Sequence, residues 1–252
     1  MITDERRREL LLEHFGKNRD RVLATYQGEP GGADELLARE RLKRAVAAVC
    51  HNLAEGSTVL DLGSGCGLGA ATLADLGYRV TAVEMVPEIV AEARRRHGDK
   101  VTWIDKAFDP KVAPQRGFDA VLSLGFLEYQ ERAGKELVRM RRMLKPGGIL
   151  LLSVPNTLAA GFGFGLTRAL FRLRKDPERI PIRHSFTPER LQRCLGMAGF
   201  ILMDYEWLPE GEGRDPLNLE RDRNFWKHRV KYRTTAEILT LSRCYRDEDT
   251  TP

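Results

Sequence analysis

The sequence of 252 residues has few cysteines and no long hydrophobic segment. Its four cysteines, Cys50, Cys66, Cys194 and Cys244, form no Cys-x-x-Cys pair. This spacing favours reduced, unconnected thiols over a disulfide framework or a cysteine-based zinc site. The longest apolar run, residues 149–154, is far shorter than the roughly 20 residues that a membrane-spanning helix needs, which excludes such a span.

The sequence also lacks an apolar signal core, internal repeats and low-complexity tracts. Residues 1–8 run directly into charge, so we expect no secretory signal peptide and a cytoplasmic location. We expect a single domain over residues 1–252, with a helical cap at residues 1–55. The net charge of +5 is common among soluble enzymes and does not by itself indicate a nucleic-acid partner.

Short β-branched or leucine-rich segments alternate with helical patterns along the chain. The expected strands are residues 58–62, 79–83, 101–104, 118–124, 149–154, 200–207 and 238–242. The expected helices between and before them are residues 36–53, 68–76, 87–97 and 131–144, followed by one that starts after Thr187 and ends at Gly199. This alternation predicts an α/β, doubly wound, mostly parallel sheet covered on both faces, and the last two strands suit an antiparallel edge.

Two local signals set helix boundaries. Proline and glycines at residues 145–148 should end the helix at residues 131–144 and turn the chain into the next strand. Thr187 followed by Pro188 is typical of a helix start, with the threonine as the cap.

The most informative segment is the glycine-rich turn at residues 63–67, which follows a strand and opens a helix. Glycines at alternate positions permit strained turns and let a ligand approach the backbone. In open α/β sheets, ligands bind at the carboxyl ends of the strands. Glu84 ends the next expected strand, where a carboxylate can accept hydrogen bonds from both ribose hydroxyls.

A dinucleotide-binding fold is an alternative interpretation, because residues 65–70 also satisfy Gly-x-Gly-x-x-Ala. However, Asp61 places a negative charge where the strand meets the loop. That charge is unfavourable beside a pyrophosphate and suits a ligand with an ammonium and a sulfonium.

With these motifs, the chain resembles the class I S-adenosylmethionine-dependent methyltransferases, which have a Rossmann-like seven-stranded sheet. The resemblance covers residues 58–154 and rests on the loop at residues 61–67, Glu84, residues 118–123 and residues 143–148. Residues 184–189 and 198–200 extend it to the small-molecule branch that includes the ubiquinone-type O-methyltransferases.

The resemblance implies a set of residues that bind S-adenosylmethionine. The loop would wrap the methionine part, Glu84 would hold the ribose and Met85 would lie against the adenine, while Tyr26 either closes over the methionine carboxylate or packs its own helix. The full expected set is Tyr26, Asp61, Gly63, Gly65, Gly67, Glu84, Met85, Asp105, Ser123 and Leu124.

Some methyl acceptors need a proton acceptor, and His184 is the first candidate for that base because histidine titrates near neutral pH. Its alternative role is a structural histidine in the loop before Thr187. Glu128 is the second candidate, with a surface or helix-entry position as its alternative. We expect no metal, because the pair Glu128-Tyr129 stands where some relatives have a Glu-His pair.

Residues 156–186 are expected to form a substrate-side insertion or lid. They combine glycines with Phe162, Phe164, Arg172 and Arg174, which suit an apolar or anionic acceptor. The alternatives for this segment are an amphipathic helix packed on the core and a helix that contacts a membrane surface.

The function predicted from these features is methyl transfer (EC 2.1.1) to a small molecule, on oxygen. We expect no nucleic-acid partner, because no Asn-Pro-Pro-Tyr-type motif follows the fourth expected strand. The alternatives are a nicotinamide-dependent oxidoreductase and a non-catalytic cofactor-binding or RNA-associated module. The sequence does not indicate the oligomeric state.

Overall fold

The computed structural model describes residues 4–25, 33–109, 116–157, 184–209 and 235–245. Its strands are β1 Thr58–Leu62, β2 Arg79–Val83, β3 Thr102–Ile104, β4 Phe118–Leu124, β5 Leu144–Pro155, β6 Phe200–Pro209 and β7 Thr235–Cys244. Its α-helices are α1 Asp4–Lys17, α2 Arg19–Ala24, α3 Ala33–Asn52, α4 Leu68–Asp75, α5 Pro87–His97, α6 Ala133–Met143 and α8 Pro188–Met197, with short 3-10 helices η1 Gly98–Lys100 and η2 Leu127–Tyr129.

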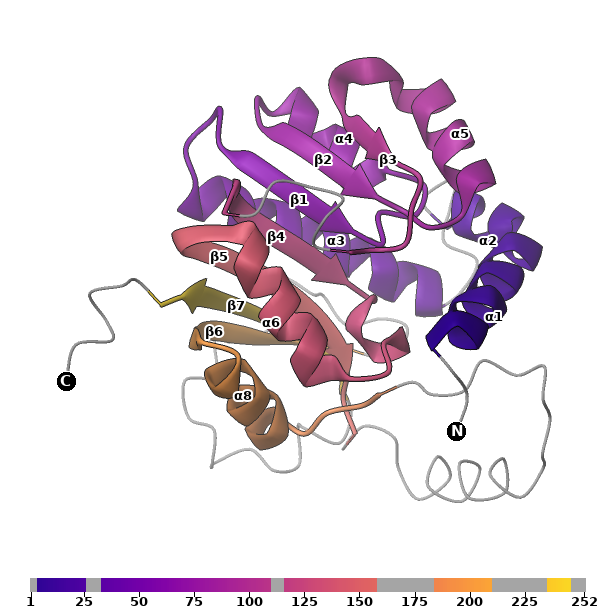
Figure 1. Cartoon of the computed structure of the whole chain (residues 1–252). Helices are drawn as coiled ribbons and strands as arrows, with labels where there is room; N and C mark the ends of the chain where they lie inside the picture. Colours follow the sequence, from indigo (N-terminus) through magenta and orange to yellow (C-terminus); the bar gives the residue numbers. More distant parts are fainter. Residues whose placement is uncertain (1–3, 26–32, 110–115, 158–183, 210–234, 246–252) are drawn as a thin grey trace, which may run out of the picture.

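The strands form one seven-stranded sheet in the order β3-β2-β1-β4-β5-β7-β6 (Figure 1). Strands β1 to β5 are parallel, whereas β7 runs antiparallel to both β5 and β6. The predicted doubly wound, mostly parallel sheet is therefore confirmed. The antiparallel strand, β7, is the second strand from the edge of the sheet, because it inserts between β5 and β6.

Helices cover both faces of the sheet (Figure 1). On one face, Leu137 and Met140 of α6 and Leu191 of α8 pack against Leu60 and Val121 of the sheet. On the other face, buried residues of α3, α4 and α5 pack against alternate residues of the same strands. Two apolar layers enclose the sheet, which leaves the ends of its strands as the place for a site.

Most predicted boundaries agree with the structure to within a few residues. Helix α5 begins at Pro87, and the Thr187 hydroxyl caps α8 by accepting a hydrogen bond from the Arg190 N–H at 3.3 Å, as predicted. One boundary is wrong, because β5 begins at Leu144 and includes residues 145–148, which were expected to form a turn before the strand. The pairing of β5 with β4 is interrupted there and resumes at Ile149, so the proline and glycines produce an irregularity within the strand.

A polar cluster ties the amino end of β1 to β4 and β5. The backbone N–H and the hydroxyl of Thr58 both lie within 2.8 Å of Asp119 Oδ2, and Lys145 Nζ lies 2.8 Å from both Asp119 oxygens. Burial alone would raise the pKa of Asp119, but the hydrogen bonds from Lys145 and Thr58 outweigh it and lower the pKa. This part of the family-like motif therefore holds strands together at the end of the sheet opposite the glycine loop.

We expect Asp119→Ala to lower the free energy of unfolding by about 1–3 kcal/mol, since it leaves the donors of Thr58 and Lys145 without their acceptor. Because the pKa is lowered in the folded state, this stabilisation is present above pH 3.8 and is lost as the pH falls through the folded-state pKa. Urea denaturation at pH 7 measures it. Asp75→Ala is the control, since Asp75 pairs with Lys100 on the surface; an equal loss in both variants would contradict the assignment.

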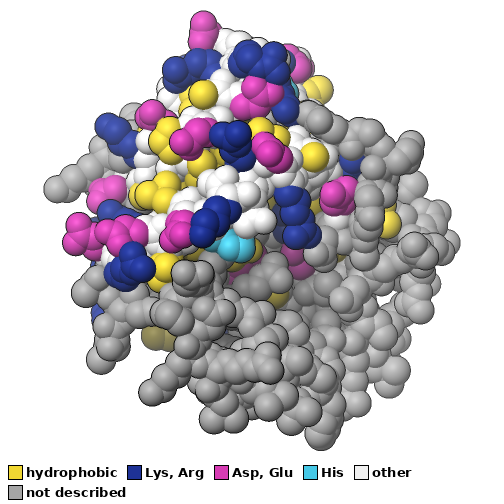
Figure 2. Space-filling model, turned by 90° about the vertical axis from the view of Figure 1, so that its right-hand side faces the viewer, with side chains coloured by type: hydrophobic (Ala, Val, Ile, Leu, Met, Phe, Trp, Pro, Cys, Tyr) yellow, Lys and Arg dark blue, Asp and Glu magenta, His cyan; other side chains and the backbone are white. Residues whose placement is uncertain are grey.

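Charges on the surface are mixed in sign. On the face that Figure 2 shows, Lys and Arg side chains alternate with Asp and Glu side chains among the coloured residues. Within the described ranges, no helix combines the length and the apolar character needed to cross a membrane.

Candidate active site

The glycine loop lies at the carboxyl end of β1, between β2 and the start of α4. The N–H groups of Gly63 and Ser64 both donate to the Val83 carbonyl, at 2.8 and 3.2 Å. Gly67 has φ +76°, and a Cβ at this position would collide with the indole ring of Trp103. The loop is therefore fixed against the end of β2, and its last glycine is required by both its dihedral angle and its neighbour.

Two carboxylates lie beside this loop. Asp61 is a buried residue of β1, with 6% of its surface exposed. Glu84 directly follows β2, and its carboxylate accepts hydrogen bonds from the N–H groups of Gly65 at 3.1 Å, Met85 at 2.7 Å and Val86 at 3.1 Å. The structure thus places Asp61, Glu84 and the glycines together, as the sequence predicted from their positions at neighbouring strand ends.

The environment of this pair raises both carboxyl pKa values. Burial, followed by the nearby charge of Glu84, raises the pKa of Asp61 to about 7. Burial also raises the pKa of Glu84, although its three backbone hydrogen bonds act in the opposite direction. Two carboxyls that resist ionisation next to each other form a region suited to a positively charged ligand group.

The end of β4 provides the adjacent surface. Ser123 is fully buried, and its hydroxyl has no hydrogen-bond partner among the described residues. Leu124 is half-buried, and the N–H of Gly125 donates to the Ser153 hydroxyl at 3.0 Å. The ring of Phe126 comes within 3.0 Å of the position that a Cβ on Gly63 would occupy, so the residues after β4 pack directly on the glycine loop.

An ion pair near the end of β4 was missed by sequence reasoning. Arg41 of α3 donates from Nη1 to both carboxylate oxygens of Glu237 in β7, at 2.9 and 3.0 Å, and both side chains are largely buried. The same guanidinium group comes within 3.1 Å of the position of a Cβ on Gly125. Arg41 is one of several charged residues in its helix, so no sequence signal distinguishes it from its neighbours.

Two further predicted cofactor residues, Met85 and Asp105, lie at neighbouring strand ends. Met85 follows Glu84 and is half-buried, and Asp105 is an exposed residue directly after β3. Both therefore lie at the same edge of the sheet as the glycine loop. Tyr26, Phe162, Phe164, Arg172 and Arg174 lie outside the described residues.

His184 is anchored to the segment that follows β4. Its N–H donates to the Glu128 carbonyl at 2.8 Å, and its ring Nε2 lies 3.1 Å from the Glu131 carbonyl. Because a carbonyl oxygen only accepts, Nε2 carries the proton and Nδ1 is the ring nitrogen that could accept one. The structure therefore positions His184 beside η2 and is compatible with both roles considered for it.

Glu128 does not lie on the surface, which was one part of the alternative considered for it; it lies in a short helix. Its side chain is only 1% exposed, within the 3-10 helix η2. The next residue, Tyr129, packs edge-on against Phe15 of α1, with 5.3 Å between the ring centroids. Across the described ranges, no three His, Cys, Asp or Glu side chains gather as a metal site would require, and the expected absence of a metal stays a prediction.

Comparisons with known proteins match the segment that contains the glycine loop to methyltransferases. Residues 60–152 match the family described as "Methyltransferase domain". The ubiquinone biosynthesis O-methyltransferase of Xanthomonas axonopodis pv. citri (strain 306) is 34% identical over 154 residues, which cover 59% of this chain and 64% of that protein. Its counterpart from Xanthomonas oryzae pv. oryzae (strain PXO99A) is 35% identical over 126 residues, covering 48% and 53%. The chain thus spans less than two thirds of either relative.

Solved structures share the fold over nearly the whole chain. A Burkholderia thailandensis 1,6-didemethyltoxoflavin-N1-methyltransferase, crystallised with S-adenosylhomocysteine, has a TM-score of 0.66 at 20% identity and covers 97% of this chain and 92% of its own. The magnesium protoporphyrin IX methyltransferase of Synechocystis PCC 6803 has a TM-score of 0.68 at 17% identity, covering 94% and 99%.

The fold is that of the class I S-adenosylmethionine-dependent methyltransferases. Residues 60–152 match the model of a methyltransferase domain, in agreement with the resemblance.

Proposed function

We propose that this chain is an S-adenosylmethionine-dependent methyltransferase that acts on an oxygen atom of a small molecule. The observation that carries the proposal is the pair of carboxylates, Asp61 and Glu84, at a glycine loop between two strand ends. The relatives named as ubiquinone biosynthesis O-methyltransferases support oxygen as the acceptor atom.

The described residues fit S-adenosylmethionine in their chemistry. Asp61 suits the ammonium group of the methionine part, and Glu84 suits the two ribose hydroxyls. Arg41 lies at the same edge, next to Gly125, but its charge is already paired with Glu237, so we assign it no contact with the ligand. The buried hydroxyls of Ser64 and Ser123, which have no partner among the described residues, are further hydrogen-bonding groups on this surface.

The proposed mechanism needs little from the protein beyond alignment. When bound, S-adenosylmethionine would supply a methyl group bonded to a sulfonium sulfur, and that sulfur would leave as a neutral thioether as the bond to the acceptor forms. Ser123, Leu124 and Phe126 would form the floor on which the acceptor oxygen is aligned and from which water is excluded. For an acceptor that must lose a proton, Nδ1 of His184 is the group we propose to receive it, because Nε2 is engaged with Glu131.

The acceptor is proposed to carry an anionic or lipophilic group. This part rests on the sequence of Phe162, Phe164, Arg172 and Arg174. A panel of phenols, offered in carboxylate and neutral forms with radiolabelled methyl donor, tests it. We expect label in oxygen-methylated product and a lower KM for the carboxylate form, which Arg172→Gln with Arg174→Gln should abolish; label only on nitrogen or carbon would refute the oxygen acceptor.

Glu84→Gln is expected to weaken S-adenosylhomocysteine binding by about 1–3 kcal/mol, because it replaces a charged acceptor of the ribose hydroxyls with a neutral one. Isothermal titration calorimetry measures the change. Glu88→Gln is the matched control, since Glu88 lies in the first turn of α5 and is exposed. Equal affinities of the wild type and Glu84→Gln would place the ribose elsewhere.

A further inference from the structure

Helix α2 covers the glycine loop but is weakly packed. It has six residues, and none of its side chains is buried. Its contact with the loop is made by Val22, whose Cγ1 is 3.5 Å from the position of a Cβ on Gly65. In Figure 1, α1 and α2 lie across the end of the sheet at which β1 and β4 terminate. A helix with few buried contacts belongs to the least stable part of a fold.

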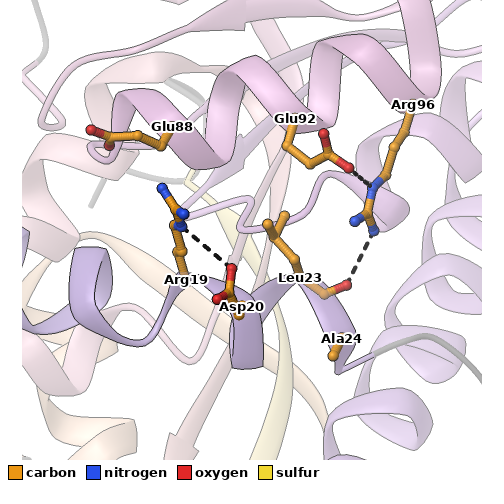
Figure 3. A pocket seen from close by; sticks show the side chains of 7 residues that line it. All are labelled: Arg19, Asp20, Leu23, Ala24, Glu88, Glu92 and Arg96. Carbon is orange, nitrogen blue, oxygen red and sulfur yellow. Dashed lines mark hydrogen bonds and ion pairs between the residues drawn. The ribbon is translucent and has the colours of Figure 1, made fainter.

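Two arginines from the body of the domain hold the carboxyl end of α2. Arg96 of α5 donates from Nη1 to the Leu23 carbonyl at 3.1 Å, and Arg39 of α3 donates from Nε to the Thr25 carbonyl at 3.1 Å. Carbonyls at a helix end lack partners within the helix, and cations there are favourable. Glu92 orients Arg96 through an ion pair of 2.6 Å (Figure 3).

The rest of the space between α2 and α5 is open. A cavity of about 440 Å³ separates the two helices. It is lined by Arg19, Asp20, Leu23, Ala24, Glu88, Glu92 and Arg96 (Figure 3). Helix α2 is therefore bound to the rest of the domain at its carboxyl end, whereas a cavity lies along its side that faces α5.

We propose that Arg39 and Arg96 are positioning residues that hold α2 as a strap across the glycine loop, and that the strap opens to let the cofactor enter and leave. This inference rests on the proposed function, since it requires a ligand on the loop. A ligand that contacts the backbone at Gly65 must occupy space next to Val22. The two arginine-to-carbonyl hydrogen bonds then set how often that space is accessible.

The test is the kinetics of S-adenosylhomocysteine binding, followed by tryptophan fluorescence, to which Trp103 beside the loop contributes. Arg96→Met should raise the association and dissociation rate constants together, by roughly tenfold, because it removes one charge-assisted hydrogen bond from the closed state. The equilibrium Kd should change by less than about threefold, since the strap is closed in the ligand-free protein as well.

Arg95→Met is the matched control. Arg95 also pairs with Glu92, at 2.7 Å, but its side chain is 71% exposed and lies outside the lining of the cavity between α2 and α5. Its rate constants should equal those of the wild type. Arg39→Met repeats the test from α3, with exposed Lys43→Met as its control.

Hydrogen exchange gives a second readout that does not depend on the ligand. Amides of residues 19–25 should exchange faster in Arg96→Met and Arg39→Met than in either control, whereas those of β1 should not. The proposed strap would be refuted by unchanged rate constants in both Arg96→Met and Arg39→Met, or by a rise in the dissociation rate constant alone. Failure of the wild type to bind S-adenosylhomocysteine would instead overturn the proposed function.

Discussion

Asp61→Asn is expected to stabilise the ligand-free protein at pH 8 while weakening its binding of S-adenosylhomocysteine. The pKa of Asp61 is raised to about 7 by burial and by Glu84, from an ordinary value of 3.8. Between these values the folded protein holds a proton that the unfolded chain releases. The contribution of Asp61 to stability is therefore fully present below pH 3.8 and is lost as the pH rises through 7.

The size of this effect follows from the same shift. A pKa raised from 3.8 to about 7 lowers the free energy of unfolding at pH 8 by at most about 4 kcal/mol. The neutral asparagine does not ionise and so avoids this loss. Urea denaturation of the wild type and the variant at pH 8 and pH 5 measures it. We expect the difference at pH 5 to be about a third to a half of that at pH 8, with no difference for the exposed control Asp99→Asn. A variant less stable than the wild type at pH 8 would contradict this account.

Ligand affinity should depend on pH in the opposite sense. With a pKa of about 7, Asp61 is mostly neutral at pH 6 and mostly ionised at pH 8. Since the ionised form pairs with an ammonium group, affinity for S-adenosylhomocysteine should rise about tenfold over this range. Asp61→Asn should bind about 10–100-fold more weakly at pH 8 and lose this pH dependence. An unchanged pH dependence in the variant would assign the titration to another group.

Gly67→Ala is expected to lower the free energy of unfolding by about 2–4 kcal/mol, from a strained backbone and an overpacked neighbour. Gly67 has φ +76°, and the added methyl group would collide with the Trp103 ring. That ring has little room to move, because its Nε1 donates to the Gly98 carbonyl at 3.0 Å and its face stacks on His97.

Gly56→Ala separates the two causes. Gly56 has φ +81°, but a Cβ there would have no atom within 4 Å. This control should lose only about 1 kcal/mol, from the backbone alone. Urea denaturation of both variants measures the difference, which reports the collision with Trp103. Equal losses in the two variants would show that the loop has room for a side chain.

The elements that the sequence predicts well are those with local causes. Helix α5 starts at Pro87 because proline suits the first helical turn, and the Thr187 cap accepts its hydrogen bond within three residues. Asp61 and Glu84 come together because each lies at the end of a strand in a parallel pair. A pattern of strands and glycines is sufficient to locate both.

The elements that the sequence does not predict depend on contacts between distant segments. Arg41 meets Glu237, far along the chain, and no local pattern pairs these two residues. The burial of Glu128 and the pKa of Asp61 depend on how several elements pack around them. Strand β7 inserts between β5 and β6. The sequence patterns of β6 and β7 are similar, so periodicity does not predict which of the two lies next to β5.

Calorimetric titration of the wild-type protein with S-adenosylhomocysteine and, separately, with NADH tests the central claim most directly. A loop bordered by Asp61 and Glu84 should accept the ligand with an ammonium group and reject the one with a pyrophosphate. We predict one S-adenosylhomocysteine per chain with a micromolar Kd, and no heat of binding with NADH. Binding of NADH without binding of S-adenosylhomocysteine would contradict the assignment as a methyltransferase.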